Sequence, residues 1–288
     1  MSEEKKVAVV KDQKIATKDP FEKFDPAQTV VTMENLLNKG AHFGHLKSKR
    51  HPAMNPFIWT TRNGVSIIDL EKTVEMLKDA MVFLAKVAKS NKKIVLVGTK
   101  RQARALILSA AKKGGLPYVV ERWLGGTFTN FSVIRARTKF LTEGQEMMEK
   151  GEFKKYTKFE RMKKQEELDR LEKKMGGIKE VTEMPGAIVV TGIKEDHLAI
   201  AEAQKMGIPV VAIADTNTDP RHCDYVVPAN DDAVSSLEFF LECVLTAATA
   251  PETVLEKYTK KEAEVKKEVK KDDKKESDKK EKGVKKEA

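Results

Sequence analysis

The stretch that decides the fold is Ile94-Val95-Leu96-Val97-Gly98. An unbroken run of large aliphatic residues closed by a glycine is typical of a parallel strand buried on both faces of a sheet. A helix is predicted directly after it at 100–113, and Gly114-Gly115 supply a stop signal for that helix. A buried strand followed at once by a helix indicates an α/β domain.

The same alternation resumes further along the chain. Apolar runs predict strands at 187–191, 209–214 and 225–227, and amphipathic runs predict helices at 195–206 and 232–246. Strands that alternate with helices imply a mainly parallel sheet that is covered by helices on both faces.

The segment that precedes the deciding strand predicts a small antiparallel unit. Residues 57–61 and 65–70 flank Arg62-Asn63-Gly64, and an Asn-Gly pair supplies the positive φ angles of a tight hairpin turn. Thr32 is a candidate cap for a short helix at 33–38. Asp69 precedes a long amphipathic helix with apolar residues at three- and four-residue steps.

Residues 131–175 interrupt the alternation, because no strand pattern occurs there. Ile134, Leu141 and Met148 stand seven residues apart, and Gly151 is a turn candidate. A second run then carries Phe159, Met162, Leu168, Leu171 and Met175. We therefore predict an antiparallel coiled-coil hairpin, which projects from the body because its apolar stripe is narrow.

The predicted organisation has four parts. Residues 1–28 form a mobile leader, 29–130 and 176–250 form the α/β globular domain, and 131–175 form the hairpin. Residues 251–288 form a disordered tail rich in Lys and Glu, which lacks the apolar surface to offset the entropy of ordering. This tail is either solvated or a weak arm for polyanions, and its small net charge favours the first interpretation.

The composition indicates a polyanionic partner. The 288 residues include 54 Lys and Arg against 44 Asp and Glu, a formal net charge of +10. Such an excess suits nucleic acid or an anionic membrane surface. Two cysteines cannot build a disulfide framework, and the apolar runs are strand-sized rather than long enough to span a membrane. Without a secretory signal pattern, we expect a cytoplasmic protein with no membrane partner.

The junction Val97-Gly98-Thr99-Lys100 is a candidate phosphate site, because a strand here meets the start of a helix. It lacks the spacing of a Walker loop, and the chain has no glycine-rich dinucleotide fingerprint. With Arg101 and Arg104 nearby, the junction favours a backbone phosphate of RNA over a free nucleotide. The alternative is an ordinary strand-to-helix junction with a solvated basic helix.

Histidines and aspartates give a second candidate site. His42, His45 and His51 could bind zinc, but no acidic or cysteine ligand is near them in sequence, and His42 and His45 are expected in a loop. The aspartates that stand near strand ends are Asp215, Asp219, Asp231 and Asp232. Asp is also a common turn former, and no nucleophile with its base accompanies them. We expect no metal, cofactor, small-molecule substrate or enzymatic activity.

Basic residues mixed with aromatic and amide side chains suit RNA, whose phosphates fix position and whose exposed bases stack. The predicted RNA contacts are Lys47, Lys49, Arg50, His51, Lys100, Arg101, Arg104, Arg122, Asn130, Arg135, Arg137 and Lys139. Taken singly, each of these clusters is equally compatible with a solvated surface.

Long motifs occur in order between about residues 30 and 248. They are Leu36-Leu37-Asn38-Lys39-Gly40-Ala41-His42-Phe43-Gly44-His45, Arg62-Asn63-Gly64-Val65-Ser66-Ile67-Ile68-Asp69-Leu70-Glu71-Lys72-Thr73, Val97-Gly98-Thr99-Lys100-Arg101-Gln102, Glu121-Arg122-Trp123-Leu124-Gly125-Gly126-Thr127-Phe128-Thr129-Asn130-Phe131, Gly207-Ile208-Pro209-Val210-Val211-Ala212-Ile213-Ala214-Asp215-Thr216-Asn217-Thr218-Asp219-Pro220 and Asn230-Asp231-Asp232-Ala233. Together they resemble the family of small-subunit ribosomal protein two, in its bacterial form.

The resemblance implies a flavodoxin-like α/β sandwich with a protruding coiled-coil hairpin. It implies a structural component of the small ribosomal subunit that binds small-subunit rRNA between head and body, on the solvent side. It also implies neighbouring small-subunit proteins as partners, among them the large mRNA-binding first protein, whose docking it supports.

The chain departs from the family pattern at two places. Arg50-His51-Pro52 stands where an aromatic–Asn–Pro step is usual, and Thr191-Gly192-Ile193 replaces a common Asp-Pro. Two rival functions stay open on the sequence. One is an enzyme on a doubly wound sheet that binds a nucleotide at Lys100 or Asp215, and the other is a regulatory RNA-binder outside the ribosome.

Overall fold

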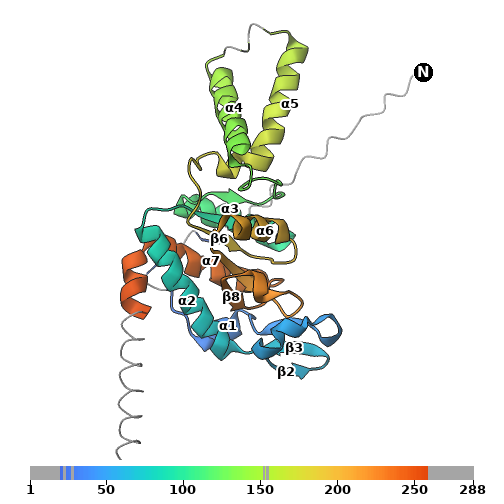
Figure 1. Cartoon of the computed structure of the whole chain (residues 1–288), viewed down its shortest axis with the longest axis vertical. Coiled ribbons are helices and arrows are strands. Elements are labelled where there is room, and N and C mark those ends of the chain that lie inside the picture. Colours follow the sequence, from blue (N-terminus) through green and yellow to red (C-terminus); the bar gives the residue numbers. More distant parts are fainter. Residues whose placement is uncertain (1–19, 22–23, 27–28, 152, 154–155, 259–288) are drawn as a thin grey trace, which may run out of the picture.

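A computed structural model describes residues 20–21, 24–26, 29–151, 153 and 156–258. Most of the predicted leader, 1–28, and most of the predicted tail, 251–288, lie outside the described residues. Figure 1 shows the described residues in colour.

A five-stranded parallel sheet forms the centre of the body. Its strands are β4 (Ile94–Val97), β5 (Tyr118–Val119), β6 (Ala187–Val190), β7 (Val210–Ala214) and β8 (Tyr225–Pro228). They lie in the order β5-β4-β6-β7-β8, and each neighbouring pair is parallel. Counted along the chain this is the order 2-1-3-4-5 of flavodoxin-like sheets, with the switch of direction between β4 and β6. The predicted α/β class and parallel sheet are confirmed.

Helices cover both faces of this sheet (Figure 1). The helices α2 (Leu70–Lys89), α3 (Arg101–Gly114) and α7 (Val234–Thr249) share one core with Ile94 and Leu96 of β4. Helix α6 (His197–Met206) shares the other core with Val95 and Val97. All four residues of β4 are buried, because alternate side chains of a strand point to opposite faces and both faces are covered.

A second, antiparallel sheet precedes the main one. It contains β1 (Phe43–Leu46), β2 (Ile58–Arg62) and β3 (Val65–Ile68) in the order β1-β3-β2, and follows the short helix α1 (Met33–Asn38). The predicted hairpin is confirmed, with φ of 50° at Asn63 and 78° at Gly64. The predicted cap of α1 is confirmed, since Thr32 accepts from the Asn35 N–H, and Asp69 caps α2 by accepting from the Glu71 N–H.

One local prediction is wrong. His42 and His45 were expected in a loop; His42 does lie in a turn, but His45 belongs to β1, where Phe43 pairs with Ile67 and Leu46 with Val65. The segment shows no period-two pattern, because both of its faces are at least partly exposed. Its strand character comes from hydrogen bonds to β3, which the local sequence does not encode. Two short 3₁₀ helices, Lys47–Lys49 and Pro52–Phe57, lead from β1 to β2.

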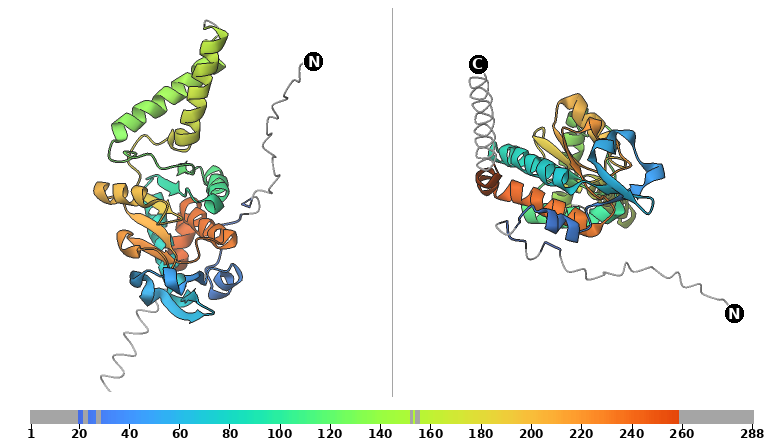
Figure 2. Two further views of the ribbon diagram at one scale, coloured as in Figure 1. Left: turned by 90° about the vertical axis from the view of Figure 1, so that its right-hand side faces the viewer. Right: turned by 90° about the horizontal axis from the view of Figure 1, so that it is seen from below.

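Residues 131–175 form two consecutive helices, α4 (Phe131–Glu149) and α5 (Lys158–Met175), that project from one end of the body (Figures 1 and 2). The antiparallel sheet lies at the opposite end. The two helices meet where the backbone of Gly144 approaches the Leu168 side chain and the Gln145 amide donates to Glu172 at 2.8 Å. Several apolar side chains of the predicted stripe are nevertheless exposed, namely Met148, Phe159 and Met162.

The body extends beyond the predicted boundary at both ends. Residues 251–258, assigned to the tail from their sequence, are helical, and Val254 and Tyr258 are buried in the core. Phe21, assigned to the leader, is buried in the same core. Isolated apolar residues among charged ones give no periodic pattern in the sequence. Phe21, Val254 and Tyr258 become part of the core only because distant parts of the chain form a surface on which they pack.

Among the described residues, no single helix has the length and hydropathy needed to cross a membrane. One bent pair, Val234–Thr249 with Pro251–Tyr258, passes the test together by length and composition, with a bend of 105°. Helix α7 of this pair is a core helix, with most of its residues buried.

Candidate nucleic-acid interface

The predicted RNA contacts fall into three groups in space. Lys47, Lys49, Arg50 and His51 follow β1, and Lys100, Arg101 and Arg104 lie at the start of α3. The third group is at the base of the projecting helices: Arg122, Asn130, Arg135, Arg137 and Lys139. The three groups differ in how far their charges are already paired within the chain.

Lys100 is the most enclosed of these cations, with a side chain 13% exposed. Its Nζ lies 2.8 Å from Asp231 Oδ1 and 2.7 Å from Asp232 Oδ1. Burial alone lowers the pKa of Lys100, but the two aspartates outweigh it and the pKa is raised. Burial in turn raises the pKa of Asp231 to about 6, against the opposing hydrogen bond from Lys100. The charge of Lys100 is thus neutralised inside the chain.

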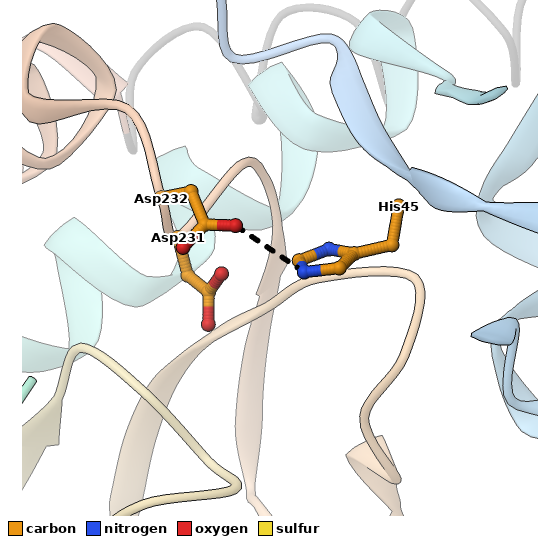
Figure 3. A group of neighbouring side chains, drawn as sticks. All are labelled: His45, Asp231 and Asp232. Atoms are coloured by element: carbon orange, nitrogen blue, oxygen red, sulfur yellow. Dashed lines mark ion pairs between the residues drawn. The ribbon is translucent and has the colours of Figure 1, made fainter.

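His45 extends this ion-pair network to the antiparallel sheet. Its Nδ1 lies 3.1 Å from Asp215 Oδ2 and its Nε2 lies 3.2 Å from Asp232 Oδ2. Figure 3 shows the imidazole directed at Asp232, with Asp231 beside it in the same loop. The network therefore joins β1 to the carboxyl ends of β7 and β8.

Gly44 permits this close approach of β1 to the main sheet. A Cβ at Gly44 would lie 2.5 Å from the Thr216 side chain. The neighbouring His45 N–H donates to Thr216 Oγ1 at 2.8 Å, and the His51 N–H donates to the Thr216 carbonyl at 2.8 Å. These bonds set the position of residues 47–50, which run between the two anchor points.

The histidine cluster considered for zinc does not form a site. Among the described residues, one group of three potential metal ligands lies close together, His45 with Asp231 and Asp232, whose ligand atoms are within 4.8 Å of one another. The Lys100 ammonium is already bound to both of these aspartates. His42 stacks beside Phe43, and His51 accepts a hydrogen bond from the Ala53 N–H. The acidic partners of His45, Asp215 and Asp232, come from loops 170 and 187 residues away in sequence.

The strand-to-helix junction proposed for a phosphate carries its own carboxylate. Asp196 accepts from Thr99 Oγ1 at 2.9 Å and from the Thr99 N–H at 3.3 Å. Burial raises the pKa of Asp196 to about 6, although the bonds from Thr99 oppose the rise. Arg104 is also engaged, donating to the Thr99 carbonyl at 2.8 Å and pairing with Glu121 at 3.4 Å. Since a backbone donor of the junction is taken, the geometry does not favour a free nucleotide there.

An open cleft of about 500 Å³ lies beside the network. Its lining combines lysines with acidic and amide side chains: His45, Lys49, Lys100, Lys194, Glu195, Asn217, Asp231 and Asp232. The structure thus brings Lys49 of the first group beside Lys100 of the second. Charges of both signs alternate around the cleft, which is unlike the uniformly basic groove that tracks a phosphate backbone.

The third group keeps its cations available. Arg122, Arg135 and Arg137 are exposed, and among the described residues none of them is in an ion pair. Lys139 is also exposed and pairs loosely with Glu143 at 3.6 Å. Asn130 precedes α4 as its cap residue but makes no capping hydrogen bond through its side chain.

Comparison with known proteins identifies the family. The sequence profile described as Ribosomal protein S2 matches residues 36–251. The chain belongs to the ribosomal protein S2 family. Proteins called "Small ribosomal subunit protein uS2" from Chloroherpeton thalassium and Roseiflexus castenholzii are 45% and 44% identical to it, over 75% and 77% of this chain and 87% and 84% of theirs. The one from Chloroflexus aggregans is 43% identical over 76% of this chain and 92% of its own.

Membership of the S2 family settles the class of protein. Its relatives are structural ribosomal proteins of bacterial type rather than enzymes, so the family resemblance and the non-enzymatic class are confirmed. The RNA contacts of individual residues stay predictions.

Three residues that matter in the structure were missed in the sequence. Trp59 is 76% exposed on β2, and an aromatic that follows Phe57 and Ile58 at the start of a predicted strand gives no sign of exposure. Asp196 and Glu202 are buried acids. Glu202 offered a signal, because it interrupts the apolar face that Ala199 and Ala203 form on a predicted helix.

Proposed function

We propose that this S2-family chain is a structural component of the cytoplasmic small ribosomal subunit and binds small-subunit rRNA. The observation that supports it most directly is the set of exposed arginines Arg122, Arg135 and Arg137, which lack acidic partners among the described residues. Arginines in this state can neutralise phosphates without first breaking an internal ion pair. The exposed Lys47, Lys49 and Arg101 add further phosphate contacts.

We further propose that α4 and α5 act as one inserted coiled-coil hairpin. Ile134, Leu141 and Leu168 are buried, which supports packing along the inner part of the stripe. Close approach of Gly144 to Leu168 is the kind of small-to-large fit that coiled-coil packing uses. The hairpin would carry Arg135, Arg137 and Lys139 outward from the body to reach rRNA.

The antiparallel sheet is the proposed support for docking of the large mRNA-binding first protein. Its outward face carries Phe43 opposite Ile67, while Ser66 and Ile68 of the same strand are buried on the other face. Trp59, at a register shift of β2, is strongly exposed beside them. Exposed apolar patches of this kind mark protein–protein contacts.

Co-sedimentation tests the proposal. Small subunits that lack this protein are incubated with the full-length chain and separated on high-magnesium gradients. We expect the chain to move with the subunits in about equal amount. Absence of the chain from the subunit fraction would refute ribosomal binding, and cross-linking mainly to other RNAs would favour the regulatory RNA-binder.

The same gradients test the docking surface. Trp59→Ala should leave incorporation of the chain unchanged but reduce the amount of the first protein that sediments with the subunit. Thr61→Ala, an exposed change on the same strand, is the matched control. Equal amounts of the first protein with Trp59→Ala and with Thr61→Ala would exclude the sheet as its support.

A further inference from the structure

The loop of residues 120–130 joins β5 to α4 and contains no strand or helix. It carries Arg122 and Asn130, and Arg135 follows one helical turn into α4. A loop lacks the regular hydrogen bonds of a helix or sheet that pair backbone N–H groups, and each buried N–H needs a partner. The conformation of this loop therefore depends on whatever accepts from those groups.

A single side chain accepts from much of the loop. Glu202 of α6 is buried, and its Oε1 receives the Gly126 N–H at 2.7 Å and the Trp123 indole N–H at 3.2 Å. Its Oε2 receives the Phe128 N–H at 3.0 Å, the Thr129 N–H at 3.3 Å and the Thr129 hydroxyl at 3.4 Å. Burial raises the pKa of Glu202, but these donors together bring it below its ordinary value. Glu202 is thus a carboxylate whose negative charge is stabilised by hydrogen bonds from the loop.

Apolar packing fixes the position of the loop but does not set the direction of its backbone. Trp123 and Phe128 are buried edge to face, with ring centroids 4.9 Å apart, in the same core as Ile134 of α4. Such packing is non-directional. The bonds to Glu202 are directional, since each N–H must point at an oxygen. Within the loop, the Thr127 N–H donates to the Leu124 carbonyl at 3.1 Å and the Asn130 N–H to the Gly126 carbonyl at 2.9 Å. The bonds to Glu202 add the link that orients this turn against α6.

We propose that Glu202 is a positioning residue for RNA binding, which fixes loop 120–130 so that Arg122 and the first basic residues of α4 face the same RNA surface. This inference rests on the proposed rRNA binding. Glu202 itself lies beneath the loop and touches no RNA. Its effect on binding acts entirely through the geometry of the residues that it holds.

Glu202→Gln is the direct test, because glutamine keeps the shape but replaces one acceptor oxygen by an NH₂ group that faces the loop donors. Binding of the full-length variant to a small-subunit rRNA transcript is measured at several salt concentrations, at a temperature where melting curves show it folded. We expect affinity at least about tenfold weaker and a salt slope lower by about one unit, since fewer phosphates are engaged together. Amide exchange at Gly126, Phe128 and Thr129 should accelerate while β4 and β6 stay protected. Glu75→Gln, the same charge change on an exposed part of α2, should bind like the native protein.

A folded Glu202→Gln variant that binds within twofold of the native protein would overturn the proposal. If that variant does not fold, Trp123→Phe and Thr129→Val decide, because each removes one side-chain donor to Glu202. Thr129→Val is nearly isosteric, whereas Trp123→Phe keeps an aromatic ring but loses part of the buried indole, so its melting curve must show it folded. Each should weaken binding about two- to threefold, and unchanged affinity in both would overturn the proposal. Failure of the native protein to bind the transcript would instead refute the proposed function, and amide exchange would still show whether Glu202 fixes the loop.

Discussion

Two segments that carry predicted RNA contacts are held by carboxylates in different ways. Residues 43–51 are tied to the main sheet through His45, whose ring lies against Asp215 and Asp232, and the neighbouring Lys100 pairs with Asp231 and Asp232. Loop 120–130 is held through its backbone N–H groups, which donate to Glu202. The first arrangement neutralises Lys100, whereas the second leaves Arg122 exposed and unpaired among the described residues.

This difference shows that basic residues that look equally suited to RNA in the sequence differ in the folded protein in whether their charge is available. Lys100 and Arg122 both lie in clusters that suit RNA, yet the charge of Lys100 is balanced within the protein. An internal ion pair must be broken or shared before its cation can release a counterion from RNA. The salt dependence of rRNA binding should therefore come mainly from the end of the molecule that carries α4 and α5.

The largest effect is expected from a substitution that disrupts the ion pairs of Lys100. Lys100→Ala removes the ammonium between Asp231 and Asp232 and should lower the free energy of unfolding by about 2–3 kcal/mol, since Asp231 stays buried without its cation. The salt slope of rRNA binding should change little. Denaturant unfolding and binding titrations measure the two quantities. Lys112→Ala, a change at an exposed lysine of the same helix that is not among the predicted RNA contacts, is the control. A large fall in slope with unchanged stability would assign Lys100 to RNA rather than to the network.

The second test removes the unpaired cations. Changing Arg122, Arg135 and Arg137 together to alanine should reduce the salt slope of rRNA binding by about two to three units, with stability almost unchanged because all three are exposed. Changing Lys49 and Arg50 together should reduce it by about one to two units. Filter binding at stepped salt concentrations gives both slopes. If the second pair had the larger effect, the contrast between the two ends would be reversed.

The smallest effect concerns pH. The pKa of Asp196 is raised to about 6 from 3.8 by burial, so the folded state holds this proton more tightly than the unfolded state. Stability from this group is present at low pH and is lost as pH rises from about 4 to 6. Asp196→Asn has no proton to lose and should flatten the unfolding free energy across that window by about 2 kcal/mol. Asp231, whose pKa is also near 6, keeps part of the pH dependence. Parallel pH curves for the variant and the native protein would contradict the role of Asp196.

Much of the fold could be predicted because its signals are local. The strand at 94–97, the Asn63-Gly64 turn, the cap Thr32 and the long helix after Asp69 each depend on nearby residues, and the structure confirms them. The strand β1 and the core contacts of Phe21 and Tyr258 could not be predicted, because they depend on surfaces from distant parts of the chain. The same holds for the candidate site: its basic residues could be predicted from the sequence, but the acidic residues that pair with them could not.

The sequence by itself determined the α/β class, the interruption at 131–175 and the family, because period, turn chemistry and ordered motifs are properties of neighbouring residues. Only the tertiary structure decided which charges are free. Lys100 meets Asp231 across 131 residues, and Glu202 meets the Gly126 N–H across 76. Electrostatic interactions depend on distance and burial rather than on position along the chain, so the fold assigns one cation to the interior and leaves another for a partner.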